Sequence, residues 1–238
     1  HYMDNMIING TITSVNHEKQ YVSIEYLHKD KKKTITCRTD DKEGQKVKKP
    51  HQYRIGDAVR FQIKGADRGK RIIAFNLQFL YNTAIEQLIH KAATDNRFTG
   101  YLKRVEDALF VKEIGSYIFF PLVLSPWEIP PAENNFNEPV EFILLNLDKP
   151  NSLAAELFTH HYIPEFRKAV QHFKSKIPID ATVSKVTPYG AHASFFNNKI
   201  QAKLQLPGNK VPAAMKAGHA ISVMIAHLSN TRIVVEPS

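Results

Sequence analysis

The fold is decided by residues 7–27, which read IINGTITSVNHEKQYVSIEYL. A glycine precedes a run in which apolar and polar residues alternate, the polar segment NHEK follows, and a second alternating run completes the stretch. Alternation with a period of two is typical of a strand that is buried on one face, and a short polar segment between two such strands indicates a turn. The stretch therefore predicts the beginning of an antiparallel β-meander.

A similar pattern occurs three times along the 238 residues. Each cycle begins with a strand near a small residue and ends with a strand pair that contains GDAVRFQI, EPVEFILL or GHAISVMI. Internal repetition indicates repeated structural units, and five short strands per unit are typical of a small oligonucleotide-binding (OB) barrel. We therefore expect an all-β chain of three tandem five-stranded OB-fold barrels with helical connectors.

Two helices are expected between the strand-rich cycles. TAIEQLIHKAAT has apolar residues at helical spacing, with Thr83 as its N-terminal cap, and NSLAAELFTHHYIPEFRKAVQHFKSK predicts a helix that Pro164 interrupts. The expected domains are a first barrel at 3–80, a helical linker at 81–97, a second barrel with a C-terminal helix at 98–178, and a third barrel at 179–238.

The net charge of +9 is unevenly distributed. Residues 3–80 carry 16 basic and 9 acidic side chains, residues 98–178 carry 8 and 10, and residues 179–238 carry 6 and 2. A positive potential over the two outer thirds favours a polyanionic partner, because neutralising phosphates releases counterions. The alternative is that the charge serves solubility alone.

Several classes of protein are disfavoured by the sequence. The single cysteine, Cys37, cannot form an intrachain disulfide, and no Cys/His cluster has the spacing of zinc ligands. No apolar run reaches the roughly 20 residues of a membrane helix, and the N-terminus lacks the order of a signal peptide. No phosphate-binding glycine loop or nucleophile motif occurs. We therefore expect a cytoplasmic protein that is no enzyme and has no metal or cofactor.

The cycles resemble two known families. GTITSVNHEKQYVSI and GDAVRFQIKGADRGKRIIAFNL resemble the two ends of a cold-shock domain, and GYLKRV, YIFFPLVL and EPVEFILL resemble a degenerate one. VTPYGAHASF and GHAISVMI are similar to the S-one RNA-binding domain. Together these resemblances touch most of the chain, and they imply OB folds that bind RNA.

The chain also departs from both families. Ser14 and Ser23 stand where cold-shock domains carry rings, and Pro121 replaces the usual histidine of the middle cycle. In the last cycle His192 takes a place usually held by phenylalanine, and Gln205 one often held by histidine. The surface on which bases would stack is therefore thinner than in strong binders of these families.

Candidate contact residues in the first cycle follow from the alternation. Stacking a base requires a ring on the solvent face of a strand. Val22 and Ile24 point to one face, so Tyr21 points to the other with Lys19 beside it. Lysines and arginines of the connections would hold phosphates without reading sequence; the alternatives are an exposed tyrosine without a role and solvated turns. The expected contacts are Lys19, Tyr21, Lys33 and Arg38.

The other two cycles offer further candidates. Phe119 either stacks a base or packs against the connecting helix, and the net charge of −2 in its segment favours packing. In KVTPYGAHASFF, residues 185–196, Gly190 is expected to adopt a positive φ that lets Tyr189 stand over the barrel mouth. One of the two final phenylalanines is expected in the core and the other at the surface. The expected contacts are Phe119, Lys185, Tyr189, His192 and Phe196.

These observations predict binding of single-stranded RNA with weak sequence preference, as in an RNA chaperone or a factor of translation or decay. Single-stranded DNA is an alternative ligand, because no residue identifies a reader of the 2′-hydroxyl. A protein-interaction scaffold, whose OB domains have lost nucleic-acid binding, is the alternative function. A nuclease site assembled from scattered carboxylates is a more distant one.

Overall fold

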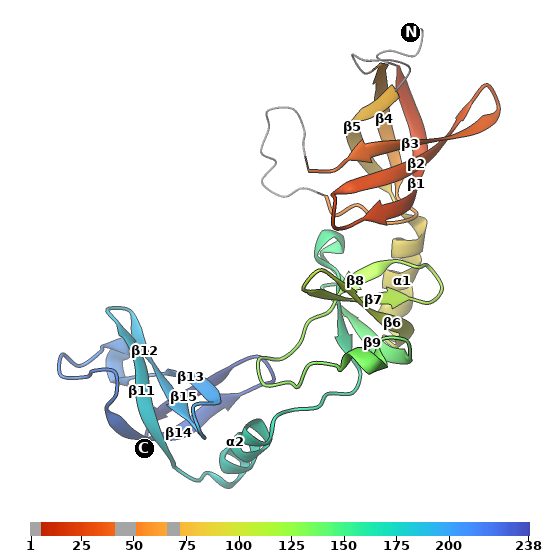
Figure 1. Ribbon diagram of the computed structural model, residues 1–238. Coiled ribbons are helices and arrows are strands. Elements are labelled where there is room, and N and C mark those ends of the chain that lie inside the picture. The colour runs from red at the N-terminus through yellow and green to blue at the C-terminus, as the bar shows by residue number, and fades with distance from the viewer. Residues whose placement is uncertain (1–5, 41–50, 66–71) are drawn as a thin grey trace. The chain divides into compact units, whose positions relative to one another are not determined.

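A computed structural model describes residues 6–40, 51–65 and 72–238 of the chain. Within these residues the chain is mostly β-strand, arranged as two five-stranded sheets and a closed five-stranded barrel (Figure 1). The predicted all-β class is confirmed. No helix in these ranges is long and apolar enough to cross a membrane.

The first sheet has the strand order β3-β2-β1-β4-β5. The alternation of its sequence is realised as predicted, since Val22, Ile24 and Tyr26 of β2 are buried and the residues between them are only half-buried. Phe61 and Ile63 of β4 complete the centre of its core. The strands are β1 (Ile7–Asn16), β2 (Tyr21–His28), β3 (Lys31–Arg38), β4 (Ala58–Gly65) and β5 (Ile72–Tyr81).

The second sheet has the order β10-β9-β6-β7-β8, and helix α1 (Thr83–Thr94) packs into its core through Ile85 and Ala92. The cap of α1 is Asn82, one residue before the predicted Thr83: the Asn82 side chain accepts a hydrogen bond of 3.0 Å from the Ile85 backbone N–H. Short 3₁₀ turns occur at Glu133–Asn135 and Pro150–Ser152. The strands are β6 (Phe98–Val105), β7 (Ala108–Glu113), β8 (Phe119–Pro121), β9 (Pro139–Leu145) and β10 (Ala154–Leu157).

The third sheet closes into a barrel of order β11-β12-β13-β15-β14. Closure comes from the antiparallel pairing of β11 with β14 and from a short parallel pairing of β13 with β15. A 3₁₀ turn occurs at Pro207–Asn209. The strands are β11 (Ile179–Thr187), β12 (Gly190–Phe195), β13 (Ile200–Leu204), β14 (Ala220–Leu228) and β15 (Ile233–Pro237).

The first strand is central in all three sheets, flanked by the second and the fourth, as in the five-stranded Greek-key arrangement of OB folds. The predicted tandem OB architecture is therefore present, but three closed barrels are not confirmed. In the first sheet β3 and β5 are not paired by backbone hydrogen bonds. In the second, no ladder joins β8 to β10, and Leu122, the residue after β8, forms a parallel bridge with Ala155.

Two glycines allow the first strand of the first and second sheets to lie close to its neighbouring strands. A Cβ on Gly10 would lie 2.6 Å from Ile24 Cγ2, and one on Gly100 would lie 2.4 Å from the Lys112 carbonyl oxygen. Each glycine sits where the first strand pairs with both of its neighbours. The close approach of the backbones therefore requires glycine at these two places.

The chain divides into two compact units, one of residues 1–123 and 132–159, the other of residues 124–131 and 160–238. The second unit holds the closed barrel and helix α2 (Pro164–Ser175), whose Phe166 stacks on Trp127 with ring centroids 5.2 Å apart. The expected helix interrupted by Pro164 is wrong. Pro164 is the first residue of α2, where its missing N–H costs nothing.

Candidate nucleic-acid interface

Three basic side chains form a row across the outer face of the closed barrel. Lys185 on β11 pairs in register with His192 on β12, which in turn pairs with Lys203 on β13. All three are exposed, while Ala193 and Ala202 beside them point into the core. Because residues directly opposite on paired strands have Cβ atoms about 4.5–5.5 Å apart, these side chains present one continuous strip. We call Lys185, His192 and Lys203 the basic row.

Two members of this row were predicted from the sequence, and Lys203 was not. The signal for Lys203 is the alternation of residues 200–204, IQAKL, in which Ile200, Ala202 and Leu204 are buried. The same period of two places Gln201 and Lys203 on the outer face.

A hydrogen-bonded polar cluster lies next to the basic row. The Ser184 hydroxyl donates to Gln201 Oε1 at 3.1 Å, and Gln201 Nε2 donates to the Ser194 hydroxyl oxygen at 3.1 Å. The Ser194 hydroxyl donates in turn to Asn198 Oδ1 at 2.8 Å. These contacts hold the Gln201 amide in place beside the row, where a donor and an acceptor can serve the edge of a base.

Tyr189 is the most exposed large side chain among the described hydrophobic residues, at 96%. It occupies the tight turn between β11 and β12, whose backbone is fixed by Thr187: the Tyr189 N–H donates to the Thr187 hydroxyl oxygen, and that hydroxyl donates to the Gly190 carbonyl. The expected positive φ at Gly190 is wrong, because Gly190 is already the first residue of strand β12. Nothing but solvent surrounds the Tyr189 ring, so it is free to stack.

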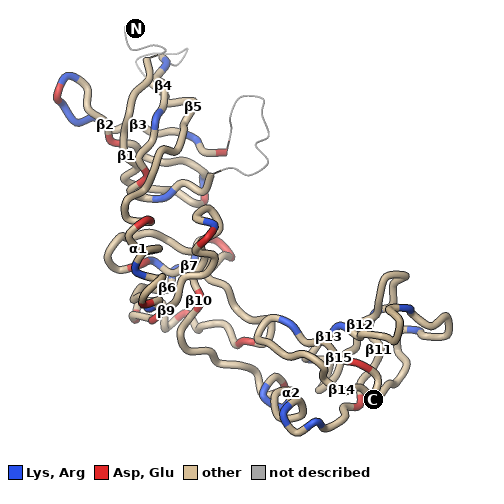
Figure 2. Tube along the Cα trace, turned by 180° about the vertical axis from the view of Figure 1, so that it is seen from behind, with Lys and Arg blue, Asp and Glu red and all other residues tan. Residues whose placement is uncertain are grey.

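Phe196 lies apart from the other predicted contacts of this barrel. Phe195 is buried, whereas Phe196 is half-buried in the turn after β12, at the opposite end of the strand from Tyr189. Its ring is 4.5 Å from Lys168 Nζ and 5.2 Å from the His172 ring, both on α2. Figure 2 shows the basic residues that recur along this helix. Phe196 thus packs against α2.

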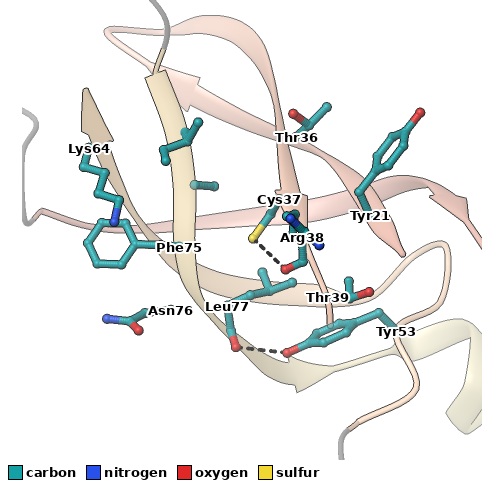
Figure 3. Close-up of a pocket in the computed structure, with 12 residues that line it drawn as sticks. Tyr21, Thr36, Cys37, Arg38, Thr39, Tyr53, Lys64, Phe75, Asn76 and Leu77 are labelled. Atoms are coloured by element: carbon teal, nitrogen blue, oxygen red, sulfur yellow. Dashed lines mark hydrogen bonds between the residues drawn. The ribbon is translucent and has the colours of Figure 1, made fainter. Parts of the chain in front are cut away.

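In the first sheet the structure brings Tyr21 and Arg38 together. They are paired in register at the ends of β2 and β3, and the Asn16 amide donates to the Tyr21 hydroxyl oxygen at 3.3 Å. Both line a pocket of about 480 Å³ between β3 and β5 (Figure 3). The Arg38 guanidinium contacts both carboxylate oxygens of Asp40, at 3.1 and 2.9 Å, and lowers the pKa of that carboxyl.

The other two candidates of this sheet differ in placement. Lys19 is exposed in the turn before Tyr21, and its backbone N–H donates to Asn16 Oδ1 at 2.9 Å. Lys33 is exposed as well but lies on the same side of β3 as the buried Cys37, hence on the side opposite to Tyr21 and Arg38. Burial raises the pKa of the Cys37 thiol to about 11, so the thiol is protonated and unreactive at neutral pH.

The outer face of the second sheet carries rings and lysines of which only Phe119 was predicted. Tyr101 on β6, Lys112 on β7 and Phe119 on β8 form one row, and Lys103 pairs with Phe110 in the next. All five are half-buried. Lys112 Nζ also lies 5.1 Å from the centroid of the Tyr117 ring. We call Tyr101, Lys103, Phe110, Lys112 and Phe119 the middle face.

The net charge of −2 of residues 98–178 gives no indication of the lysines on the middle face. Three of its carboxylates are engaged in other contacts. Glu133 pairs with Arg104, and Glu141 accepts from Arg97 at 3.1 Å. Glu113 is buried, and its oxygens accept the N–H groups of Gly115 and Ser116. The alternation of FTGYLKRV and ALFVKE would have revealed the outward lysines and rings. An average over 81 residues cannot show where the charges lie.

Phe119 is also in contact with the first sheet. The imidazole of His17, which follows β1, stacks on Phe119 at 5.4 Å with an angle of 23° between the rings, and lies 5.3 Å from Phe110. Neither of the alternatives weighed for Phe119, a base or a connecting helix, included this ring. The contact joins the two sheets of the first compact unit.

Burial of His17 makes its contribution to stability dependent on pH. Burial lowers its folded-state pKa below the ordinary value of 6.5, so the unfolded chain binds more protons as the pH falls below about 6.5. We expect the free energy of unfolding of the first unit to fall between about pH 6.5 and the lowered pKa, and less so in His17→Gln. Urea titrations at several pH values measure this; equal slopes for both proteins would contradict it.

The described part of the chain holds no group of three His, Cys, Asp or Glu residues that could bind a metal ion.

Comparison with known proteins adds little beyond the fold. No protein-family model matches the sequence, and no curated protein is significantly similar to it. Similar solved structures include a multidomain protein with nucleic-acid-binding domains from Streptococcus pneumoniae TIGR4, at 13% identity, 100% coverage of this chain, 75% of the other and a TM-score of 0.23. Drosophila Unr CSD456 gives 14% identity, 98% and 96% coverage, and 0.28.

The apo form of Mycoplasma genitalium RNase R is similar at 13% identity with a TM-score of 0.27, covering 97% of this chain and 47% of RNase R. All three structures have TM-scores below 0.3. At such TM-scores they carry no argument about this chain's ligand, which must come from its own surface.

Proposed function

We propose that this chain binds single-stranded RNA with little sequence preference, through the outer faces of the first three strands of its sheets. The observation that carries the proposal is the basic row beside the fully exposed ring of Tyr189. Lys185 and Lys203 lie on the strands to either side of His192 and can neutralise neighbouring phosphates. The exposed ring of Tyr189 can stack on an unpaired base. A duplex would hide its bases from that ring, which favours a single strand.

The middle face supports the same proposal for the first compact unit. It places the amines of Lys103 and Lys112 among three rings, and a pocket of about 320 Å³ beside it is lined by Tyr101 and Tyr117. Lysine holds phosphate as a point charge without reading sequence. Rings accept any base. Weak sequence preference follows from that combination.

A scaffold role has one specific observation in its favour, and it concerns the first sheet. Ser14, Ser23 and Thr36 are paired across β1, β2 and β3, and a register shift precedes Ser14 just as one precedes Lys185 in the barrel. Small hydroxyls thus occupy the place that the basic row has in the barrel. We infer that the first sheet binds RNA weakly, through Tyr21 and Arg38, and that Ser23 and Thr36 of its central row are free for a protein partner.

One titration tests the proposed function. Fluorescein-labelled U10 RNA is titrated with the full chain at salt concentrations from 50 to 300 mM, and dT10 is compared at each. For three to five phosphate contacts we expect the logarithm of the association constant to fall against the logarithm of salt with a slope of about −2 to −4. Absence of binding at 50 mM, or binding that is insensitive to salt, contradicts the proposal. A role as an RNA chaperone or a factor of translation or decay belongs to the same proposal.

Tyr189→Ala should lower the affinity for U10 about fivefold, the lower end of what one base–ring stack contributes. Because the ring contacts only solvent, the unfolding midpoint should not change. Tyr189→Phe keeps the stacking surface and serves as the control, with an affinity close to that of the unaltered chain. If the alanine variant binds equally well, the ring does not stack a base.

A further inference from the structure

A small pocket of about 180 Å³ lies in the first compact unit where the first and second sheets meet. It is separate from the pocket between β3 and β5, with which it shares no lining residue. Residues from both sheets and from the segment before β4 form its wall. Those that matter here are Ser14, His17, Arg54, Lys112, Tyr117 and Phe119.

Arg54 is the unusual member of this wall. It is only 6% exposed, and among the residues that the structure describes no carboxylate lies within ion-pair distance of its guanidinium. One of its five N–H donors is used, in a bond of 2.9 Å from Nη2 to the Pro150 carbonyl. The remaining donors belong to a side chain that lines the pocket.

The nearest negative charge, the carboxylate of Asp57, already accepts hydrogen bonds from other groups. Its Oδ2 accepts from the Arg54 backbone N–H at 2.8 Å and lies 2.9 Å from His51 Nε2, and its Oδ1 accepts from the Asn82 amide at 2.8 Å. Asp57 raises the pKa of Arg54, but burial lowers it more. A buried cation without a close partner is costly, so an anion that entered the pocket would gain a strong interaction.

The rest of the wall suits an anion that carries a flat group. No aspartate or glutamate is among the described residues that line the pocket, whereas Lys112 adds a second cation. Tyr117 stands at the wall with 59% of its surface exposed and a φ of 63°, a left-handed conformation. Its backbone N–H donates to the Glu113 carbonyl, and the Glu113 carboxylate holds the same turn through Gly115 and Ser116. These bonds therefore fix the backbone of the turn that carries the exposed ring.

We propose that this junction pocket binds one backbone phosphate of single-stranded RNA, held by Arg54 and Lys112, with the neighbouring base stacked on Tyr117. The planar guanidinium fork matches two phosphate oxygens, and the ammonium of Lys112 adds a point charge. The strand thereby passes from the first sheet onto the middle face. The assignment of the anion as an RNA phosphate rests on the proposed function. The inference that the pocket binds a phosphate does not rest on it.

Two variants and one control in the full chain test this proposal. Lys112→Gln should lower the affinity for U10 about fivefold at 0.1 M salt, the share of one phosphate contact. Arg54→Lys keeps the charge but loses the bidentate guanidinium contact, so it should also lower the affinity, by less than Lys112→Gln. Lys149→Gln removes the same charge from an exposed residue outside the pocket and should leave the affinity unchanged. Circular dichroism establishes that each variant is folded, and if Arg54→Lys is not, Lys112→Gln decides alone.

A smaller probe separates the pocket from RNA binding as a whole. Uridine 5′-monophosphate, at millimolar concentration, should shift the amide NMR signals of residues 14–17, 54–55 and 112–119, uridine should not, and Lys112→Gln should abolish the shifts. If the chain binds U10 but both variants bind it as tightly as the unaltered chain, the pocket proposal is overturned and the proposed function stands. If U10 does not bind at all, the proposed function falls, and the nucleotide-induced shifts alone uphold or overturn the pocket.

Discussion

Replacing Lys185 and Lys203 together by glutamine is expected to lower the affinity for U10 RNA about 25-fold at 0.1 M salt. Each lysine that neutralises a phosphate of a single strand contributes about 0.7 logarithmic units at this concentration through counterion release, so two contribute about 1.4. The slope of affinity against salt should become shallower by the same amount. Both side chains are exposed and lie on either side of His192 in register, so their removal leaves the core intact.

The matched control is Lys210→Gln with Lys216→Gln, which removes the same two charges from exposed residues of the same unit outside the basic row. If the loss came from the overall charge of the protein, both double variants would weaken binding alike. If only the pair from the row does so, the geometry of the row is responsible. An unchanged affinity of the Lys185/Lys203 variant would remove the observation on which the proposed function rests.

The sequence predicted the strands well because their cause is local. Alternation of buried and exposed residues, as in Val22 and Ile24 of β2, depends on neighbours a few residues apart. Closure of the sheets depends instead on whether the third and fifth strands meet, and these are far apart in the chain. Pro164 is a second example of an ambiguous local signal. Proline interrupts the interior of a helix but also fits its first turn, where Pro164 lies.

Residues of the candidate site were predicted where the alternation within one strand determines which side chains are exposed. They were missed where the packing of several strands determines this. Tyr189 and His192 are exposed as expected. Tyr101 and Lys103 could have been found from their alternation, but the charge of the whole segment argued against them. The contact of His17 with Phe119 joins residues about 100 positions apart, and no local pattern announces such a contact.

Asp57 is the residue whose loss is expected to cost the most stability in the first unit. Its side chain is fully buried and receives donors from three places: the Arg54 backbone, the His51 ring and the Asn82 amide. Asn82 at the same time caps α1. The Asp57 carbonyl also accepts from the Ile12 N–H of β1 at 2.9 Å. The carboxylate therefore ties the first sheet to the helix that packs on the second.

Asp57→Asn keeps the size of the side chain but turns one acceptor oxygen into an NH₂ group that faces a donor. A buried donor without an acceptor costs about 1–3 kcal/mol, and bonds to a charged group are the stronger ones, so we expect a loss of about 2–3 kcal/mol in the free energy of unfolding. Urea unfolding followed by circular dichroism measures it, and Asp148→Asn, at an exposed turn, should change nothing. Because Arg54 depends on Asp57 for its backbone position, the variant should also weaken U10 binding by disturbing the junction pocket. A stable Asp57→Asn protein would show that the packing of Ile55 and α1, rather than this carboxylate, holds the two sheets together.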